Sequence, residues 1–140
     1  MTEQLIQAAK EARTHAYVPY SHFQVGAVVR VGDAVYAGAN IENASFGLSM
    51  CAERNAIFAA VMAGHQQLDE ITVIGDTAGP ISPCGACRQV MAEFMAPNAP
   101  VTLANLHGTT QVTTVGELLP GAFTKGDLNQ WQNIIQALWL

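Results

Sequence analysis

The chain has few charges, few cysteines and no long apolar segment, and each scarcity excludes a class of protein. Only 12% of its 140 residues are charged while 50% are hydrophobic, which excludes a disordered or low-complexity protein. Lys and Arg number 6 against 11 Asp and Glu, and the net charge of −5 argues against a nucleic-acid partner. The longest apolar run, Ala56 to Ala63, is far shorter than the ~18 residues that a membrane span needs.

The start of the chain and its cysteine count indicate a compartment. Met1 to Lys10 contains Glu3 and Gln4 and no apolar signal region. The 3 cysteines are an odd number and too few for a disulfide scaffold. The length suits one core, and the sequence has no internal repeat, linker or charge block. We therefore expect a single domain, residues 1–140, in the reducing environment of the cytoplasm.

Helical and strand-like patterns follow one another along the chain. Apolar residues at helical spacing predict a first helix that ends before Pro19, and Gly32-Asp33 predicts a hairpin turn. The predicted strands are 24–31, 34–39, 71–75, 101–104 and 111–114, the later helices are 51–63 and 84–95, and 40–50 and 76–83 are loops. Two early strands followed by alternating helices and strands predict an α/β sandwich, with helices on a mixed sheet of about five strands.

The C-terminal segment, about 128–140, has the pattern of an amphipathic helix. Its large apolar residues recur at intervals of three and four positions and share one face: Trp131, Ile134, Ile135, Leu138 and Trp139. The segment lacks the Lys and Arg side chains that interfacial helices present to a membrane. We expect this face to pack on its own domain or on a neighbouring subunit.

All three cysteines stand at the starts of predicted helices. Cys51 begins one helix, and Cys84 and Cys87 share the first turn of another, so their thiols point the same way. Helix N-termini carry partial positive charge and favour the thiolate that a metal needs. Three converging thiolates with an open fourth position describe a catalytic zinc site. Ordinary core cysteines or a redox Cys-x-x-Cys pair are the alternatives, and the redox pair leaves Cys51 unexplained.

Glu53 supplies a proton-transfer group beside this cluster. A ligand-x-Glu element followed by Pro-Cys-x-x-Cys is the pattern of zinc deaminases, in which the Glu moves protons and is not a ligand. The usual first ligand is His, and this sequence has Cys51. Residues i and i+2 lie roughly 200° apart on a regular helix, so both can face one ion only if Cys51 lies at an irregular helix start. A solvent-facing helix Glu is the alternative.

Several motifs occur together between about Tyr17 and Phe123: Tyr17-Val18-Pro19-Tyr20-Ser21, Asn40-Ile41-Glu42-Asn43-Ala44, Cys51-Ala52-Glu53-Arg54, Pro83-Cys84-Gly85-Ala86-Cys87-Arg88-Gln89 and Leu118-Leu119-Pro120. With this set the chain resembles the small zinc-dependent cytidine deaminases of pyrimidine salvage. The resemblance implies a three-layer α/β/α sandwich and a homotetramer with one Zn²⁺ per chain, each near subunit boundaries.

The resemblance also implies substrate contacts. Asn40 and Glu42 would hold the ribose hydroxyls, Phe23 would pack against the pyrimidine beside Ala52, and Phe123 would close the site from a neighbouring subunit. A carboxylate accepts from a hydroxyl and an amide both donates and accepts, so these roles are chemically sound. From the residues alone, Asn40 and Glu42 are better explained as part of a polar loop, and Phe23 and Phe123 as core residues.

The expected reaction is hydrolytic deamination at C4 of cytidine and deoxycytidine to uridine products and ammonia. Glu53 would carry the protons, and Arg54 would offset the negative charge of three thiolates. Three alternatives stay open. A structural zinc module would need a fourth ligand such as a histidine, and a deaminase of blasticidin-type aminonucleosides would share the zinc motif. A polynucleotide deaminase would need a cationic path for the strand, which 6 basic residues hardly provide.

Overall fold

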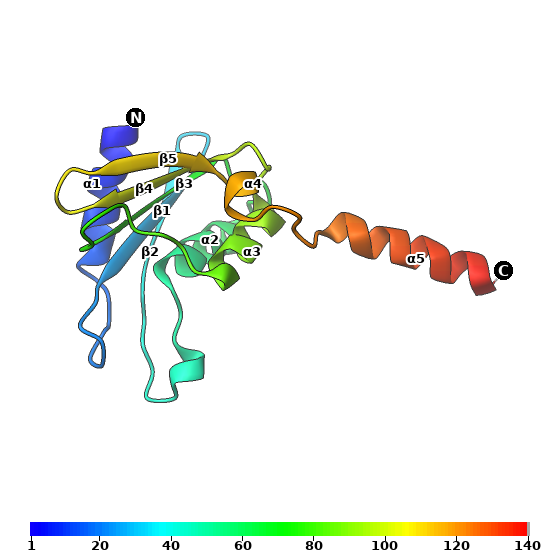
Figure 1. Cartoon of the computed structure of the whole chain (residues 1–140), viewed down its shortest axis with the longest axis horizontal. Coiled ribbons are helices and arrows are strands. Elements are labelled where there is room, and N and C mark those ends of the chain that lie inside the picture. The colour runs from blue at the N-terminus through cyan, green and yellow to red at the C-terminus, as the bar shows by residue number, and fades with distance from the viewer. Residues whose placement is uncertain (140) are drawn as a thin grey trace.

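A mixed five-stranded sheet forms the centre of the computed structural model, which describes residues 1–139 (Figure 1). The strands are β1 (Val25–Val31), β2 (Ala34–Ala39), β3 (Glu70–Gly75), β4 (Pro100–Asn105) and β5 (Thr110–Thr114), in the order β2-β1-β3-β4-β5. β3 and β4 run parallel, and the other neighbouring pairs are antiparallel. The mixed sheet expected from the sequence is confirmed.

Helices cover both faces of this sheet. On one face α1 (Thr2–Arg13) buries Leu5, Ile6 and Ala9 against side chains of β1, β3 and β4. On the other face α2 (Ala52–Met62) and α3 (Gly85–Phe94) enclose the larger part of the core, which includes Ile57 and Met91. The central strands are buried from both sides and therefore read as nearly continuous apolar runs. The expected α/β/α arrangement is confirmed.

Two glycines let the first two helices lie directly on the sheet. A Cβ at Gly26 would meet the backbone nitrogen of Arg13 in α1 at 2.6 Å. A Cβ at Gly38 would meet the carbonyl oxygen of Ala52 at 2.6 Å, at the first residue of α2. Distances this short are clashes, so a side chain at Gly38 would push the start of α2 away from β2. The height of that helix start above the sheet is thus fixed by a glycine.

Two short elements were not predicted from the sequence. The 3₁₀ helix η1 (Phe46–Leu48) lies in the loop expected at 40–50, and α4 (Val115–Leu118) follows β5. Helices of three and four residues are too short to leave a periodic pattern. The start of α4 instead depends on a cap, because the Thr114 side chain accepts a hydrogen bond from the Glu117 amide.

The last helix, α5 (Lys125–Trp139), projects away from the sheet (Figure 1). It begins at Lys125 rather than about 128, since the Asp127 carboxylate accepts from the Thr124 amide at 2.7 Å while the Asp127 amide donates to the Thr124 carbonyl. Every residue of α5 is exposed. Leu140, part of the predicted segment, lies outside the described residues. No helix in residues 1–139 is long and apolar enough to cross a membrane.

Candidate active site

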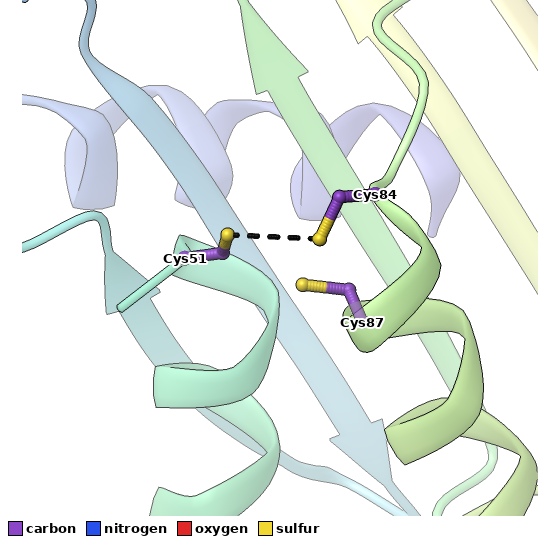
Figure 2. Close-up of side chains that lie close together, drawn as sticks. All are labelled: Cys51, Cys84 and Cys87. Atoms are coloured by element: carbon purple, nitrogen blue, oxygen red, sulfur yellow. Dashed lines mark hydrogen bonds between the residues drawn. The ribbon is translucent and has the colours of Figure 1, made fainter. Parts of the chain in front are cut away.

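The N-termini of α2 and α3 meet beside the sheet, and each begins with a cysteine (Figure 2). Cys51 is the N-cap of α2 and Cys84 the N-cap of α3, both with extended backbone, and Cys87 lies buried in the first turn of α3. The three sulfur atoms point into one space and lie within 4.8 Å of one another. Because Cys51 precedes the regular turns of α2, it can face the same space as Glu53, as the spacing required.

The geometry of the sulfurs fits a zinc ion. Two thiolates bound tetrahedrally at a Zn–S distance of about 2.3 Å would lie about 3.8 Å apart. The Sγ atoms of Cys51 and Cys84 are separated by 3.9 Å. Arg54 donates from Nη2 to the Cys51 sulfur at 3.4 Å, whereas its buried Nε has no partner within residues 1–139. A cluster of thiolates supplies the negative charge that this guanidinium faces.

The electrostatics of the cluster favour a thiolate at Cys51. A hydrogen bond from the Cys87 thiol, together with Arg54, lowers the pKa of Cys51 to about 5. The same contact with Cys51 raises the pKa of Cys87, and burial raises it further. Hydrogen bonding to the Cys51 sulfur also raises the pKa of Arg54, which stays protonated. The contacts within the cluster therefore favour a thiolate at Cys51 with the Arg54 cation beside it.

Glu53 lies in the first turn of α2 with only 5% of its surface exposed. Burial is the main reason that the pKa of its carboxyl is raised above the ordinary value. A carboxyl whose pKa moves toward neutrality can both accept and deliver a proton during a reaction. Its position suits proton transfer next to the cysteine cluster.

A pocket of about 410 Å³ opens beside the cysteines and the carboxyl. Its lining comes from four parts of the chain: Phe23 and Val25, Asn40, Cys51 to Glu53, and Thr77, Ile81, Ser82 and Cys84. Six residues predicted from the sequence thus share one cavity: Phe23, Asn40, Cys51, Ala52, Glu53 and Cys84. Cys87 and Arg54 are not part of the lining, but both contact the sulfur of Cys51, which is.

Asn40 is held by backbone groups on both sides of its amide. Its Oδ1 accepts from the Val25 amide at 2.8 Å, and its Nδ2 donates to the Phe23 carbonyl at 2.8 Å. These bonds fix the chain that carries Phe23. Because an amide has two donors and two acceptor positions, one of each remains for another partner.

Glu42 does not line this pocket and lies in a separate depression that it shares with Tyr20, Ser21, Phe46 and Ser49. Its Oε1 accepts from the amides of Tyr20 and Ser21 at 3.0 and 3.1 Å. A hydrogen bond from the Ser21 side chain is the main reason that the pKa of Glu42 is lowered. The carboxylate is therefore charged at neutral pH and also holds the 20–21 turn.

Phe123 is a predicted substrate contact that does not line the pocket beside the cysteines. Its side chain is 60% exposed, and it follows α4 on the way to α5. Its carbonyl accepts from the Gln89 side chain in α3 at 2.8 Å. The backbone at Phe123 is thus anchored while its ring faces outward.

Sequence reasoning missed the wall of the pocket formed by Thr77, Ile81 and Ser82. These residues lie in the 76–83 loop, for which no role was assigned. The position of the loop in the sequence could have indicated this role, because the loop joins the carboxyl end of β3 directly to the Pro83-Cys84 motif. A loop between a buried strand and a predicted metal ligand is well placed to line the site.

Cysteine ligands at two helix N-termini beside a buried, non-ligating glutamate are the arrangement found in zinc-dependent nucleobase deaminases. The fold and the site put the protein in that class. A family model for the cytidine and deoxycytidylate deaminase zinc-binding region matches residues 1–103. The chain belongs to the cytidine deaminase family.

Relatives and a solved structure agree with this membership. Cytidine deaminases from Halalkalibacterium halodurans and Sporosarcina psychrophila are 55% and 52% identical over 128 residues, 91% of this chain and 97% and 94% of theirs. A crystal structure of cytidine deaminase from Burkholderia pseudomallei superposes with a TM-score of 0.86 at 52% identity, covering 88% of this chain and 99% of that one. The likeness therefore extends over nearly the whole of each relative.

Proposed function

We propose that this protein catalyses the hydrolytic deamination of cytidine and 2′-deoxycytidine to uridine and 2′-deoxyuridine, with release of ammonia, in pyrimidine salvage. The observation that carries the proposal is the shared pocket, in which Glu53 and the Cys51–Cys84 pair face the same cavity as Phe23 and Asn40. The similar proteins from three organisms that bear the name cytidine deaminase support it.

Cys51, Cys84 and Cys87 would hold one Zn²⁺ per chain. When bound, zinc supplies a water molecule whose pKa is lowered for attack on C4 of the pyrimidine. Three thiolates more than neutralise the ion and weaken it as a Lewis acid. Arg54, which donates to the Cys51 sulfur, and the N-termini of α2 and α3 offset that negative charge.

Glu53 performs the proton transfers. Its carboxylate accepts a proton from the attacking water and delivers it to N3 of the ring, so that water adds across the C4–N3 bond. It then takes the proton of the new C4 hydroxyl and delivers it to the exocyclic amino group; the C4=O bond forms, the bond from C4 to the amino nitrogen breaks, and ammonia leaves. The buried position of Glu53 keeps both proton transfers inside one pocket and away from bulk water.

The substrate contacts proposed for this chain divide into base and sugar. Phe23 and Ala52 line the cavity where the pyrimidine would lie, and Asn40 still has one donor and one acceptor for a sugar hydroxyl. Glu42 would accept from a second hydroxyl. Contacts to ribose through both residues favour a free nucleoside over a blasticidin-type aminonucleoside.

We propose a homotetramer in which Phe123 of one chain closes the pocket of its neighbour. The exposed Phe123 ring, with its backbone anchored by Gln89, supports this arrangement. Large apolar side chains also remain exposed on η1, on α2 and along α5, where Trp131 and Trp139 are 60% and 86% exposed. Apolar surface of this extent indicates subunit contacts. The expected location is the cytoplasm.

A structural zinc module is the first alternative, and the metal site argues against it. Within residues 1–139 the group able to hold a metal consists of the three cysteines, with no fourth His, Asp or Glu. Structural zinc sites close with four protein ligands, whereas catalytic sites keep one position open. A polynucleotide substrate is disfavoured by the net charge of −5.

The test is ultraviolet absorbance of the purified protein with cytidine, deoxycytidine and CMP, with zinc measured per chain. We expect turnover of both nucleosides. Glu53→Ala should keep its zinc and lose turnover by ~100- to 10,000-fold, the range for a general acid–base group. Glu93→Ala, a change of an exposed carboxyl on α3, is the matched control. Equal activity of Glu53→Ala and wild type would refute the mechanism.

A further inference from the structure

Asn105 is a buried polar residue at the carboxyl end of the sheet. It is the last residue of β4 and is only 2% exposed. Its partner in the parallel β3–β4 ladder is Gly75, the last residue of β3. The two strands therefore end side by side. β3 is followed by the 76–84 loop, and β4 is followed by the turn at 106–109.

The Asn105 side-chain amide connects these two segments with four hydrogen bonds. Its Nδ2 donates to the carbonyls of Thr77 and Ala78 at 3.0 and 3.1 Å. Its Oδ1 accepts from the amides of His107 and Thr109, both at 2.9 Å. Every donor and acceptor position of the amide is used, so the bonds leave no buried polar atom unmet.

The loop held by this amide forms a wall of the pocket. Thr77 lines the cavity and is bonded through its own carbonyl to Asn105. Farther along the same loop Ile81, Ser82 and Cys84 also line the cavity, with Glu53 on the opposing helix α2. Ile81 is also packed into the core, so the loop is fixed at both of its ends.

We propose that Asn105 is a positioning residue for nucleoside binding: by holding the 77–78 backbone it sets the shape of the pocket wall. This inference rests on the proposed function of the same pocket. An amide is required because the position must donate twice and accept twice. An aspartate of the same shape would direct a carboxylate at two carbonyl oxygens and release the loop. A hydrogen bond between the Asp76 carboxylate and the His107 ring joins the same segments, but both side chains are exposed and the bond adds little.

The test compares Asn105→Asp with wild type for cytidine turnover, zinc content and hydrogen exchange of the 76–84 peptide. We expect KM to rise about 10-fold or more because the wall loses two hydrogen bonds. The value of kcat should stay within about 3-fold, since Glu53 and the cysteines do not contact Asn105. Zinc should be retained, and exchange should speed up in 76–84 and not in α1.

Two further variants make the outcome decisive. Asn98→Asp adds the same charge at an exposed position just before β4 and should match wild type. Asn105→Ala, which removes both the donors and the acceptor without adding a charge, should lie between Asn105→Asp and wild type. Unchanged KM and loop exchange in Asn105→Asp would overturn the proposal, and so would loss of zinc with faster exchange throughout the chain. If wild type fails to deaminate cytidine, the proposed function fails, and loop exchange still decides whether Asn105 holds the wall.

Discussion

The two ends of the pocket are built in different ways. At the metal end, Cys87 and Glu53 are 0% and 5% exposed and belong to the first turns of α3 and α2, while Cys51 and Cys84 are the N-caps of these helices and are less buried. The sugar end lies on loops, where Phe23 remains 39% exposed and Glu42 borders a separate depression. Phe123, the proposed lid, is 60% exposed in the single chain.

The difference indicates which end of the pocket a single chain can form without a neighbouring subunit. Helix starts packed on a sheet hold donor atoms to within fractions of an ångström, which metal binding and proton transfer require. A flexible substrate is recognised instead by loops on that scaffold. The metal end should therefore be intact in an isolated chain, while the sugar end should depend on loop contacts and on a neighbouring subunit.

The largest effect is expected from Cys87→Ser, which breaks the metal end. Serine is a hard, weakly acidic donor, so zinc should be lost and activity should fall by more than the ~100-fold upper range of outer-shell changes. Zinc content by elemental analysis and cytidine turnover check this. Ala86→Ser, at an exposed position in the same turn, should behave as wild type. Full zinc content in Cys87→Ser would remove this cysteine from the ligand set.

A smaller effect is expected from Arg54→Ala, which leaves the ligands in place. Without the guanidinium at 3.4 Å from the Cys51 sulfur, the negative charge of the thiolates is less offset. Turnover should drop by ~10- to 100-fold while zinc is retained. Arg54→Lys, which keeps the charge and loses the planar donor set, should recover part of the rate. A wild-type kcat in Arg54→Ala would show that the guanidinium is not needed to offset the charge of the thiolates.

At the sugar end, Glu42→Gln should act on KM rather than on kcat. Glutamine can still accept from the Tyr20 and Ser21 amides, so the turn is preserved while the charge is lost. We expect KM for cytidine to rise about 10-fold, the cost of weakening a hydrogen bond to a charged acceptor. Steady-state kinetics test this, with the exposed Glu3→Gln on α1 as control. A selective fall in kcat would contradict the assignment.

The lowered pKa of Glu42 gives the same prediction a pH dependence. A carboxyl with a lowered pKa stays charged at all pH values above that pKa, and its contribution is lost as pH falls through it. In wild type, Glu42 should therefore leave KM unchanged between pH 8 and about pH 5. In Glu42→Gln the KM should be raised by the same factor across this range.

The metal end could be predicted from the sequence because its chemistry is local. Cys51, Glu53, Cys84 and Cys87 lie within two short segments, and each segment marks a helix start. The order of helices and strands was also readable, since buried strands and amphipathic helices leave periodic patterns.

The sugar end could be predicted less completely because it depends on contacts between distant segments. The hydrogen bonds of Asn105 to Thr77 and Ala78 join residues 28 and 27 positions apart in the sequence, and no local pattern records them. The sequence also gave no reason to expect that Glu42 would hold the 20–21 turn. No local pattern in the sequence shows which neighbouring subunit has the pocket that Phe123 would close.

The smallest predicted effect concerns Gln89, which anchors Phe123. Its side chain donates to the Phe123 carbonyl at 2.8 Å, and one exposed neutral hydrogen bond is worth about 1 kcal/mol. Gln89→Ala should therefore raise KM for cytidine about 5-fold without changing kcat or zinc content. Gln66→Ala, at an exposed turn after α2, is the control.

Combining the change with Phe123→Ala separates anchoring from an unrelated role of Gln89. If Gln89 acts by holding Phe123, then removing the ring first should abolish most of the effect of Gln89→Ala, since the two changes act on one contact. Kinetics of the two single variants and the double variant measure this coupling. Fully additive effects would show that Gln89 and Phe123 act separately, and the lid would then need another anchor.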